Sequence, residues 1–312
     1  MARPFLSLFV VSFLSFVSFV FWIAASVPSA QSPITVAFYN IRSGKGSQPL
    51  KGHGSSFAET DNCGDKSKPV NAWGAGVVQR ELRSRIGADD SVVAIGLAEA
   101  WNCAKPSAVR QALGWNTATD ERNGTALVAR FGIKGSPRWL QLDTSHNTNP
   151  KDTAWTLGVA VCADKECHGT IDIYVSHWAG TGASAQDTYD SQARDTAKMM
   201  SESRGPHVLV GDLNVFEGTA RICNQNPNNT SLPILRAAGY VDAWATLHPG
   251  DAGFTGMTNR AGCGHPEGST WKRIDYVWSK GMTATSIERF GVVSPGDAAP
   301  SDHYGLLAAF SK

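Results

Sequence analysis

The sequence is short of net charge, of metal-binding cysteine patterns and of internal repeats. Its 28 Lys and Arg residues nearly balance 27 Asp and Glu residues, which leaves a formal charge of +1 at pH 7. Such a chain lacks the broad positive surface with which many proteins bind polyanions, although local patches remain compatible with nucleic acid. No CxxC pair or Cys/His cluster has the spacing of a zinc site. No period of 20–50 residues indicates a repeat fold.

Two common catalytic patterns are missing as well. Gly44, Gly46 and Gly52 do not stand between a strand and a helix, so they do not form a phosphate-cradling loop. Ser176 and Ser184 have no triad context, which argues against a serine hydrolase. What is present is a chain of 312 residues with 42% hydrophobic content. This length and composition suit one large α/β domain with a well-buried core.

The N-terminal segment has the layout of a secretory signal peptide. Arg3 precedes an apolar stretch from Phe5 to Ala25, and small residues follow as far as Ala30. The stretch is long enough for a membrane span, so an uncleaved anchor is the alternative. The interspersed Ser residues favour cleavage. We therefore assign residues 1–30 to a signal peptide and residues 31–312 to one domain, and we expect a secreted protein, extracellular or periplasmic.

The cysteines fit an exported protein. There are six of them, all beyond the leader, and export permits disulfides. Fifteen pairings are possible, and sequence alone does not choose among them. Cys162 and Cys167 flank a segment that is typical of a hairpin turn, so we predict that they pair. The other four are left to two further pairs, Cys223 with Cys263 and Cys63 with Cys103.

Short β-branched runs are interleaved with a few helical patterns. Strands are predicted at 34–39, 91–98, 124–130, 139–142, 153–161, 170–176, 208–210, 274–278, 284–289 and 304–310. Helices are predicted at 70–86, 106–113, 184–203 and 232–238, and a long loop at 43–69. The order follows no strict βαβ alternation, which favours one mixed α/β domain.

Polar side chains lie at or near the ends of six predicted strands. They are Asn40, Glu99, His177, Asp212 with Asn214, Asp275, and Asp302 with His303. Strand ends on one side of a sheet cluster in space, so these groups are expected to form one acidic, histidine-bearing pocket. Carboxylates hold divalent cations, a histidine handles protons and an amide orients a nucleophile. The pattern therefore indicates metal-assisted attack on a phosphate ester.

The six segments, in this order, resemble the endonuclease/exonuclease/phosphatase superfamily. They are 38–42, 97–100, 175–178, 211–214, 273–276 and 301–303, and they extend over nearly the whole mature chain. The superfamily includes pancreatic-type deoxyribonuclease, neutral sphingomyelinases and inositol-phosphate phosphatases. The resemblance implies an α/β four-layer sandwich, in which two packed mixed β-sheets are flanked by helices. It identifies the chain as an exported, bacterial-type member.

The resemblance also implies roles for the strand-end residues. Metal binding falls to Asn40, Glu99 and Asp302, and catalysis to His177, Asp212, Asn214, Asp275 and His303. His303 would contact the scissile phosphate or activate water, with Asp275 as its orienting carboxylate. Asp212 and Asn214 would orient water and phosphate oxygens, and His177 would assist the leaving oxygen. The implied cofactor is Mg²⁺ or Mn²⁺, with Ca²⁺ as an alternative structural ion. Taken singly, each residue is as readily explained by structural hydrogen bonding.

Four further residues are assigned to substrate binding. Arg42 is similar to an arginine that lies against the nucleic-acid backbone in the deoxyribonuclease branch. Trp178 and Trp271 lie near the proposed catalytic residues and would stack on a base or sugar. Their alternative is packing inside the sandwich. Arg273 completes the set, and its alternative is an ion pair with Asp275.

These observations predict a secreted, divalent-metal-dependent phosphodiesterase, a deoxyribonuclease-like nuclease with nucleic acid as substrate. One alternative acts on a phosphate-bearing lipid or small molecule, as a sphingomyelinase or a sugar-phosphate or inositol-phosphate phosphatase does. Another is a non-catalytic binding module on the same fold. We expect a monomer without a stable protein partner. Two geometric expectations follow: Asp242 caps a helix, and the Glu99 carboxylate lies within roughly a dozen ångströms of the His303 imidazole.

Overall fold

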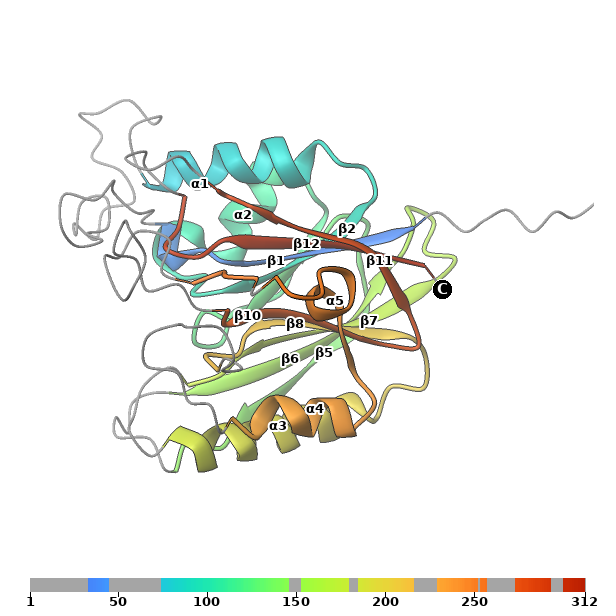
Figure 1. Ribbon diagram of the computed structural model, residues 1–312. Helices are drawn as coiled ribbons and strands as arrows, with labels where there is room; N and C mark the ends of the chain where they lie inside the picture. The colour runs from blue at the N-terminus through green and yellow to red at the C-terminus, as the bar shows by residue number, and fades with distance from the viewer. Residues whose placement is uncertain are drawn as a thin grey trace, which may run out of the picture. The chain divides into compact units, whose positions relative to one another are not determined.

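Apolar strands build two mixed six-stranded sheets (Figure 1). The computed structural model describes residues 33–44, 74–145, 153–179, 185–215, 229–251, 253–256, 273–292 and 300–311. The predictions for the signal peptide, for the loop beyond residue 44 and for Cys63, Cys223 and Cys263 lie outside these residues. No helix within them is long and apolar enough to cross a membrane.

The first sheet has the order β11-β12-β1-β2-β4-β3. Its strands are β11 (Thr283–Phe290), β12 (Gly305–Ser311), β1 (Ile34–Asn40), β2 (Val92–Ala98), β4 (Ala126–Ala129) and β3 (Thr117–Ala118). The second sheet has the order β5-β6-β7-β8-β10-β9. Its strands are β5 (Ile133–Leu142), β6 (Ala154–Cys162), β7 (Thr170–His177), β8 (His207–Asp212), β10 (Asp275–Lys280) and β9 (Val241–Asp242). The parallel pairs are β1 with β2 and β7 with β8.

Helices cover the outer face of each sheet. On the first sheet pack α1 (Gly74–Leu82), the π-helical turn Arg83–Gly87 and α2 (Pro106–Leu113). On the second pack α3 (Ala185–Met200) and α4 (Ser231–Ala237). The short α5 (Ala243–Leu247) follows β9, and 3₁₀ turns stand at Arg42–Gly44 and Asn102–Ala104. The two sheets pack together between two outer layers of helices (Figure 1). These are the four layers expected from the sequence, which confirms the fold class.

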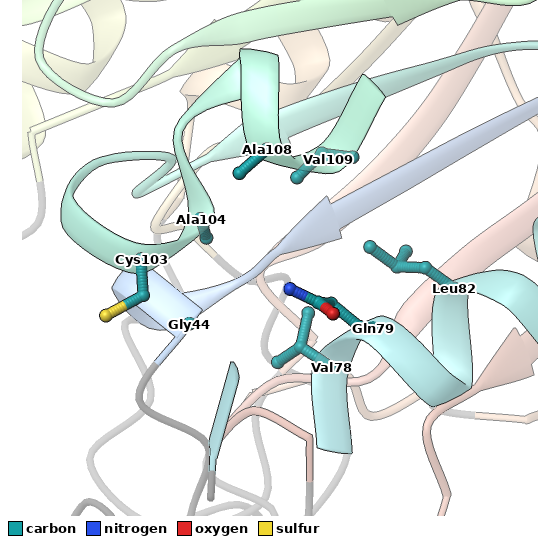
Figure 2. A pocket seen from close by; sticks show the side chains of 8 residues that line it. All are labelled: Gly44, Val78, Gln79, Leu82, Cys103, Ala104, Ala108 and Val109. Atoms are coloured by element: carbon teal, nitrogen blue, oxygen red, sulfur yellow. The ribbon is translucent and has the colours of Figure 1, made fainter. Parts of the chain in front are cut away.

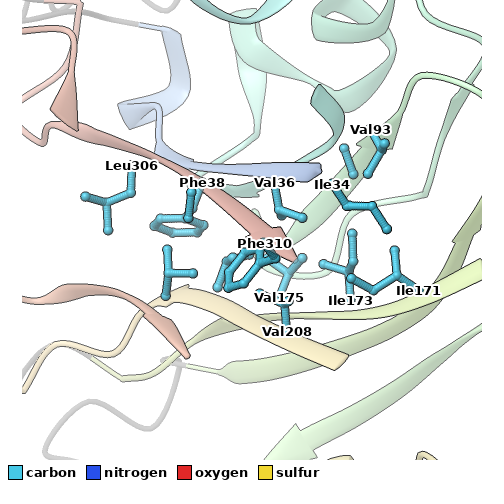
Figure 3. Packing of buried hydrophobic residues seen from close by; sticks show 14 of the residues in the cluster. Ile34, Val36, Phe38, Val93, Ile171, Ile173, Val175, Val208, Leu306 and Phe310 are labelled. Carbon is cyan, nitrogen blue, oxygen red and sulfur yellow. The ribbon is translucent and has the colours of Figure 1, made fainter. Parts of the chain in front are cut away.

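The core between the sheets comes from alternate positions on the strands. Residues i and i+2 of a strand point to the same face, and Ile34, Val36 and Phe38 of β1 meet Ile173 and Val175 of β7 across the interface (Figure 3). These five side chains are nearly or fully buried. Each buried Val, Ile or Phe contributes about 1.5–3 kcal/mol relative to exposure. The apolar inner faces therefore fix the register of both sheets.

A glycine in β2 packs directly against the second sheet. A Cβ on Gly96 would lie 2.6 Å from Val210 Cγ2 and 3.0 Å from Val175 Cγ2. We expect Gly96→Ala to destabilise the protein by roughly 1–3 kcal/mol, because the added methyl group overpacks the interface. Urea unfolding measures this. The matched control is Gly205→Ala, where a Cβ meets nothing within 4 Å, and equal stabilities of the two variants would contradict the expected overpacking.

Two predicted elements differ from the structure, which also adds the two-residue strands β3 and β9. The strand predicted at 139–142 is the end of β5, which begins at Ile133. Its first half was missed because Gly135 and Pro137 are poor strand formers, and the ladder shifts register between Lys134 and Arg138. The helix predicted at 70–86 is described from Gly74 onward and ends in a π-helical turn.

Two local predictions are confirmed. Cys162 and Cys167 form a disulfide at the turn between β6 and β7. Cys103 is disulfide-bonded as well, and its partner is not among the described residues. Asp242 caps α5, since its side chain accepts a hydrogen bond from the Ala245 amide.

Candidate active site

The polar strand ends continue the apolar inner faces. Inward positions on β8 are Val208, Val210 and then Asp212, and those on β7 end at His177 after Val175. His177 stands opposite Asp212, and Asp212 stands opposite Asp275 at the start of β10. Directly paired residues point to the same face. One row of the second sheet therefore carries an imidazole and two carboxylates at the point where the apolar core ends.

Asp212 is the centre of this arrangement and is 2% exposed. Its Oδ2 accepts a 2.9 Å hydrogen bond from Asn40 Nδ2 of the other sheet. The same oxygen lies 3.8 Å from His177 Nε2 and 3.9 Å from His303 Nε2. Its Oδ1 accepts a hydrogen bond from the Asn214 amide. Burial raises the pKa of Asp212, and Asp275 raises it further, whereas the two histidines and Asn40 oppose the shift.

A buried carboxylate orients His303. Asp275 Oδ2 lies 2.9 Å from His303 Nδ1, and Asp275 is fully buried. Thr255 Oγ1 accepts hydrogen bonds from the amides of Ile274 and Asp275 and so fixes the start of β10. Burial alone would lower the pKa of His303, but the charge and hydrogen bond of Asp275, with Asp212 beyond, hold that pKa well above its ordinary value.

Ser301 holds the loop that carries His303. Its hydroxyl donates to the Asn40 carbonyl at 2.7 Å and accepts from the His303 amide at 3.2 Å. The loop before β12 is thereby tied to the end of β1. Because Ser301 is fully buried, this contact positions His303 without facing a ligand.

Glu99 follows β2 in a left-handed backbone conformation, with φ at +53°. Its Oε1 accepts a 3.3 Å hydrogen bond from Asn40 Nδ2, and its carbonyl accepts from the Ser43 amide. Gly124 packs directly against it: a Cβ there would lie 2.7 Å from the Glu99 Cα. The surrounding backbone therefore enforces a strained conformation that turns the half-buried carboxylate toward Asn40.

Three contacts link Glu99 to His303 across both sheets. Glu99 to Asn40 is 3.3 Å, Asn40 to Asp212 is 2.9 Å, and Asp212 to His303 is 3.9 Å. The Glu99 carboxylate thus lies within the dozen or so ångströms that one hydrated ion spans. The predicted convergence of strand ends is confirmed.

Three more of the predicted residues stand around this centre. Asp302 is partly exposed, and its Oδ2 lies 3.6 Å from Arg42 Nε. Asn214 has φ at +52°, and its Nδ2 donates to the Trp178 carbonyl at 2.9 Å. That bond fixes the amide beside Asp212.

Two of the residues assigned to substrate binding have other roles. Trp178 is 1% exposed and packs with the α3 layer, where its indole donates to Thr196 Oγ1. Stacking on a substrate is therefore wrong for Trp178, and core packing is right. Arg273 forms a salt bridge with Asp242 and lies over the Tyr276 ring, so its guanidinium braces the start of β10. Trp271 lies outside the described residues.

The donor atoms suit a hard divalent cation. Ligand atoms of Asp212, Asp275 and His303 lie within 4.8 Å of one another, and the second Asp275 oxygen is buried without a hydrogen-bond partner in the described part of the chain. However, His303 and Asp275 already bond each other. Glu99 and Asp302 are partly exposed, so an ion there keeps the waters that Mg²⁺ retains. We therefore favour Glu99 and Asp302, with Asn40, as the ligands.

A small pocket lies away from this polar cluster. It is lined by apolar atoms around Val78 and Leu82 of α1 on one side and Gly44, Cys103 and Val109 on the other (Figure 2). About 10 Å³ is accessible in it, which is room for one water molecule. Its lining offers no acid or base, so the chemistry lies at the strand ends instead.

Comparison with known proteins agrees with this geometry. The model of the Endonuclease/Exonuclease/phosphatase family matches residues 38–303. No curated protein matches the sequence.

Solved structures share the fold. An endonuclease/exonuclease/phosphatase from Beutenbergia cavernae superimposes with a TM-score of 0.62 at 18% identity, covering 89% of this chain and 71% of its own. TDP2 of D. rerio, complexed with a single-strand DNA product, has a TM-score of 0.58 at 14% identity, and the match covers 90% of this chain and 100% of that one. A mannosyl-6-phosphatase of Bacteroides thetaiotaomicron has a TM-score of 0.60 at 17% identity, and the match covers 89% of this chain and 100% of that one. At these identities the likeness concerns the fold.

Proposed function

This chain belongs to the endonuclease/exonuclease/phosphatase family, whose members hydrolyse phosphoester bonds, and we propose that it is a divalent-metal-dependent phosphodiesterase that cuts nucleic acid. The observation that carries the proposal is the Asp275–His303 pair facing Asp212 across 3.9 Å. A second imidazole, His177, lies 3.8 Å from the same Asp212 oxygen. A carboxylate beside an imidazole provides a base for the attacking oxygen and an acid for the leaving oxygen of a phosphodiester displacement.

The residues divide the work by their positions. Asp275 holds Nδ1 of His303, which leaves Nε2 as the nitrogen that faces a bound phosphate. Asp212 Oδ2 accepts a proton from the attacking water as its oxygen bonds to phosphorus. His177 Nε2 gives a proton to the oxygen that leaves when the old P–O bond breaks. The proton that Asp212 took from the water then passes to His177 across their 3.8 Å separation, which restores both residues to their starting protonation states.

A fixed donor stabilises the charge that develops on the phosphate. One N–H of the Asn214 side chain is held by the Trp178 carbonyl, so its second N–H needs no reorganisation during the reaction. Family members generally use divalent metals. Glu99, Asp302 and Asn40 would hold Mg²⁺ or Mn²⁺, which when bound supplies positive charge against the phosphate oxygens.

Nucleic acid is favoured over other esters by Arg42. Its side chain is partly exposed, and its Nε lies 3.6 Å from Asp302 at the rim of the site. A guanidinium at that place suits a backbone phosphate on either side of the scissile one. A lone phosphomonoester offers no second phosphate to such a group.

A substrate panel with and without chelator tests the proposal. We expect the purified protein with Mg²⁺ to degrade single-stranded DNA or RNA, to stop in EDTA, and to recover when Mg²⁺ or Mn²⁺ is restored. Sphingomyelin and a sugar phosphate complete the panel. Release of phosphocholine or inorganic phosphate without nucleic-acid cleavage would move the protein to the lipid or phosphatase alternatives. No turnover of any member would leave a binding module.

A further inference from the structure

The row of site residues on the second sheet extends one strand beyond His177. Trp155 of β6 stands directly opposite His177. It precedes Leu157 and Val159 on the inner face of that strand, and it is only half-buried. Cross-strand partners have Cβ atoms about 5 Å apart, so the indole flanks the imidazole. Neighbouring strands are spaced by about 4.8 Å, which puts Trp155 about 10 Å from the backbone of Asp212.

An exposed arginine from the other sheet lies over this indole. The Arg122 guanidinium carbon is 4.8 Å from the Trp155 ring and 5.0 Å from the Trp139 ring. The two indoles meet edge to face at 6.3 Å. Arg122 itself stands in a tight turn, where it exchanges both backbone hydrogen bonds with Thr125. Backbone and side chain are thus both held beside the active site.

The charge of Arg122 has no carboxylate partner among the described residues. Two other arginines that lie over aromatic rings do have one: Arg130 pairs with Asp90, and Arg138 pairs with Glu202. Glu121, the neighbouring acid, accepts the Gly124 amide instead. A guanidinium stacked on indoles keeps its N–H groups free at its edge, where they bind phosphate oxygens in pairs.

We propose that Arg122, held over Trp139 and Trp155, binds the phosphate adjacent to the scissile bond in a single-stranded polynucleotide. The inference rests on the proposed function and narrows its substrate to a chain with more than one phosphate. A location one strand beyond His177 suits the next backbone phosphate on that side and not the reacting one. Because the sequence is nearly neutral overall, affinity for a polyanion depends on a few placed cations such as this one.

Arg122→Ala tests the proposal with two substrates. For a single-stranded oligonucleotide we expect KM to rise about tenfold with kcat nearly unchanged, and the slope of log KM against log salt to fall by about 0.7. For bis(p-nitrophenyl) phosphate, which has a single phosphate, we expect no change. Arg122→Lys keeps the charge but loses the planar guanidinium, so its KM for the oligonucleotide is expected to lie between those of the wild type and Arg122→Ala. The matched control is Arg138→Ala, since Arg138 lies over the ring of Tyr174, a residue on the outer face of the same sheet.

A binding measurement separates failure of this inference from failure of the proposed function. Fluorescence anisotropy with a labelled oligonucleotide in EDTA reports binding without turnover, and we expect Arg122→Ala to bind about tenfold more weakly than the wild type and Arg138→Ala. Cleavage of both substrates with equal KM in the wild type and Arg122→Ala would overturn the inference and leave the phosphodiesterase intact. Hydrolysis of the small diester with no binding of the oligonucleotide would overturn it as well. Absence of any hydrolysis would overturn the proposed function.

Discussion

Asp275→Asn is expected to lower kcat for phosphodiester hydrolysis about 10⁴-fold while KM changes little. Asparagine has nearly the same shape, and the amide of residue 275 keeps its bond to Thr255, so the fold is expected to persist. The side-chain amide, however, presents a donor or a neutral acceptor to His303 Nδ1 and no longer fixes the tautomer that directs Nε2 to the substrate. Steady-state kinetics measures the loss, and circular dichroism checks the fold.

The control for this variant is an aspartate in another structural setting. Asp164 stands in the exposed turn beside the Cys162–Cys167 disulfide, where it bonds the His168 amide. Asp164→Asn is expected to leave kcat within twofold of the wild type. If Asp275→Asn also kept more than a tenth of the wild-type kcat, orientation of His303 by Asp275 would not be the basis of catalysis.

Glu99→Gly and Glu99→Ala are both expected to lose activity by 10³-fold or more, yet to differ in stability. Each removes the carboxylate assigned to the metal. Glu99 has φ at +53°, a conformation that costs a residue with a Cβ roughly 1–2 kcal/mol and costs glycine little. The glycine variant is therefore expected to be more stable than the alanine variant by about 1 kcal/mol. Urea unfolding measures the difference in stability. Steady-state kinetics measures the loss of activity, and calorimetric titration with Mn²⁺ measures the loss of metal binding that causes it.

Asn102 supplies the matched pair for the backbone effect. It also has a positive φ, at +50°, and it is exposed. Asn102→Gly is expected to be more stable than Asn102→Ala by a similar amount, with activity unchanged in both. Equal stability of the two Glu99 variants would show that the turn at Glu99 stores no strain.

Strand periodicity was sufficient to place Asn40, His177, Asp212 and Asp275, because it determines where the residues of a strand point. Glu99 follows the inward Ala98 and turns toward Asn40 only through its left-handed backbone. Asp212 follows Val208 and Val210 at every second position, so its direction toward the core is settled locally. The same parity places Trp178, one residue after the inward His177, on the outer face, and the assignment of Trp178 to stacking overlooked this. Trp155 carried the signal too, since it stands two residues before the inward Leu157.

Other features required three-dimensional contacts. Arg122 comes from a turn of the first sheet and meets Trp139 and Trp155 of the second. No local pattern relates a turn residue to indoles 17 and 33 positions later, because the approach depends on how two whole sheets pack. The π-helical turn Arg83–Gly87 is likewise set by packing, since its sequence is that of an ordinary helix end.

The strand ends that hold the chemistry are the last members of the same alternating faces that hold the sheets together. A slip of one residue in β8 would turn Val208 and Val210 away from the opposite sheet and Asp212 away from His303 in a single event. A misaligned molecule therefore loses its core packing and its activity together. In a refolding experiment, the activity per molecule thus reports the fraction of molecules whose strands have paired in the native register.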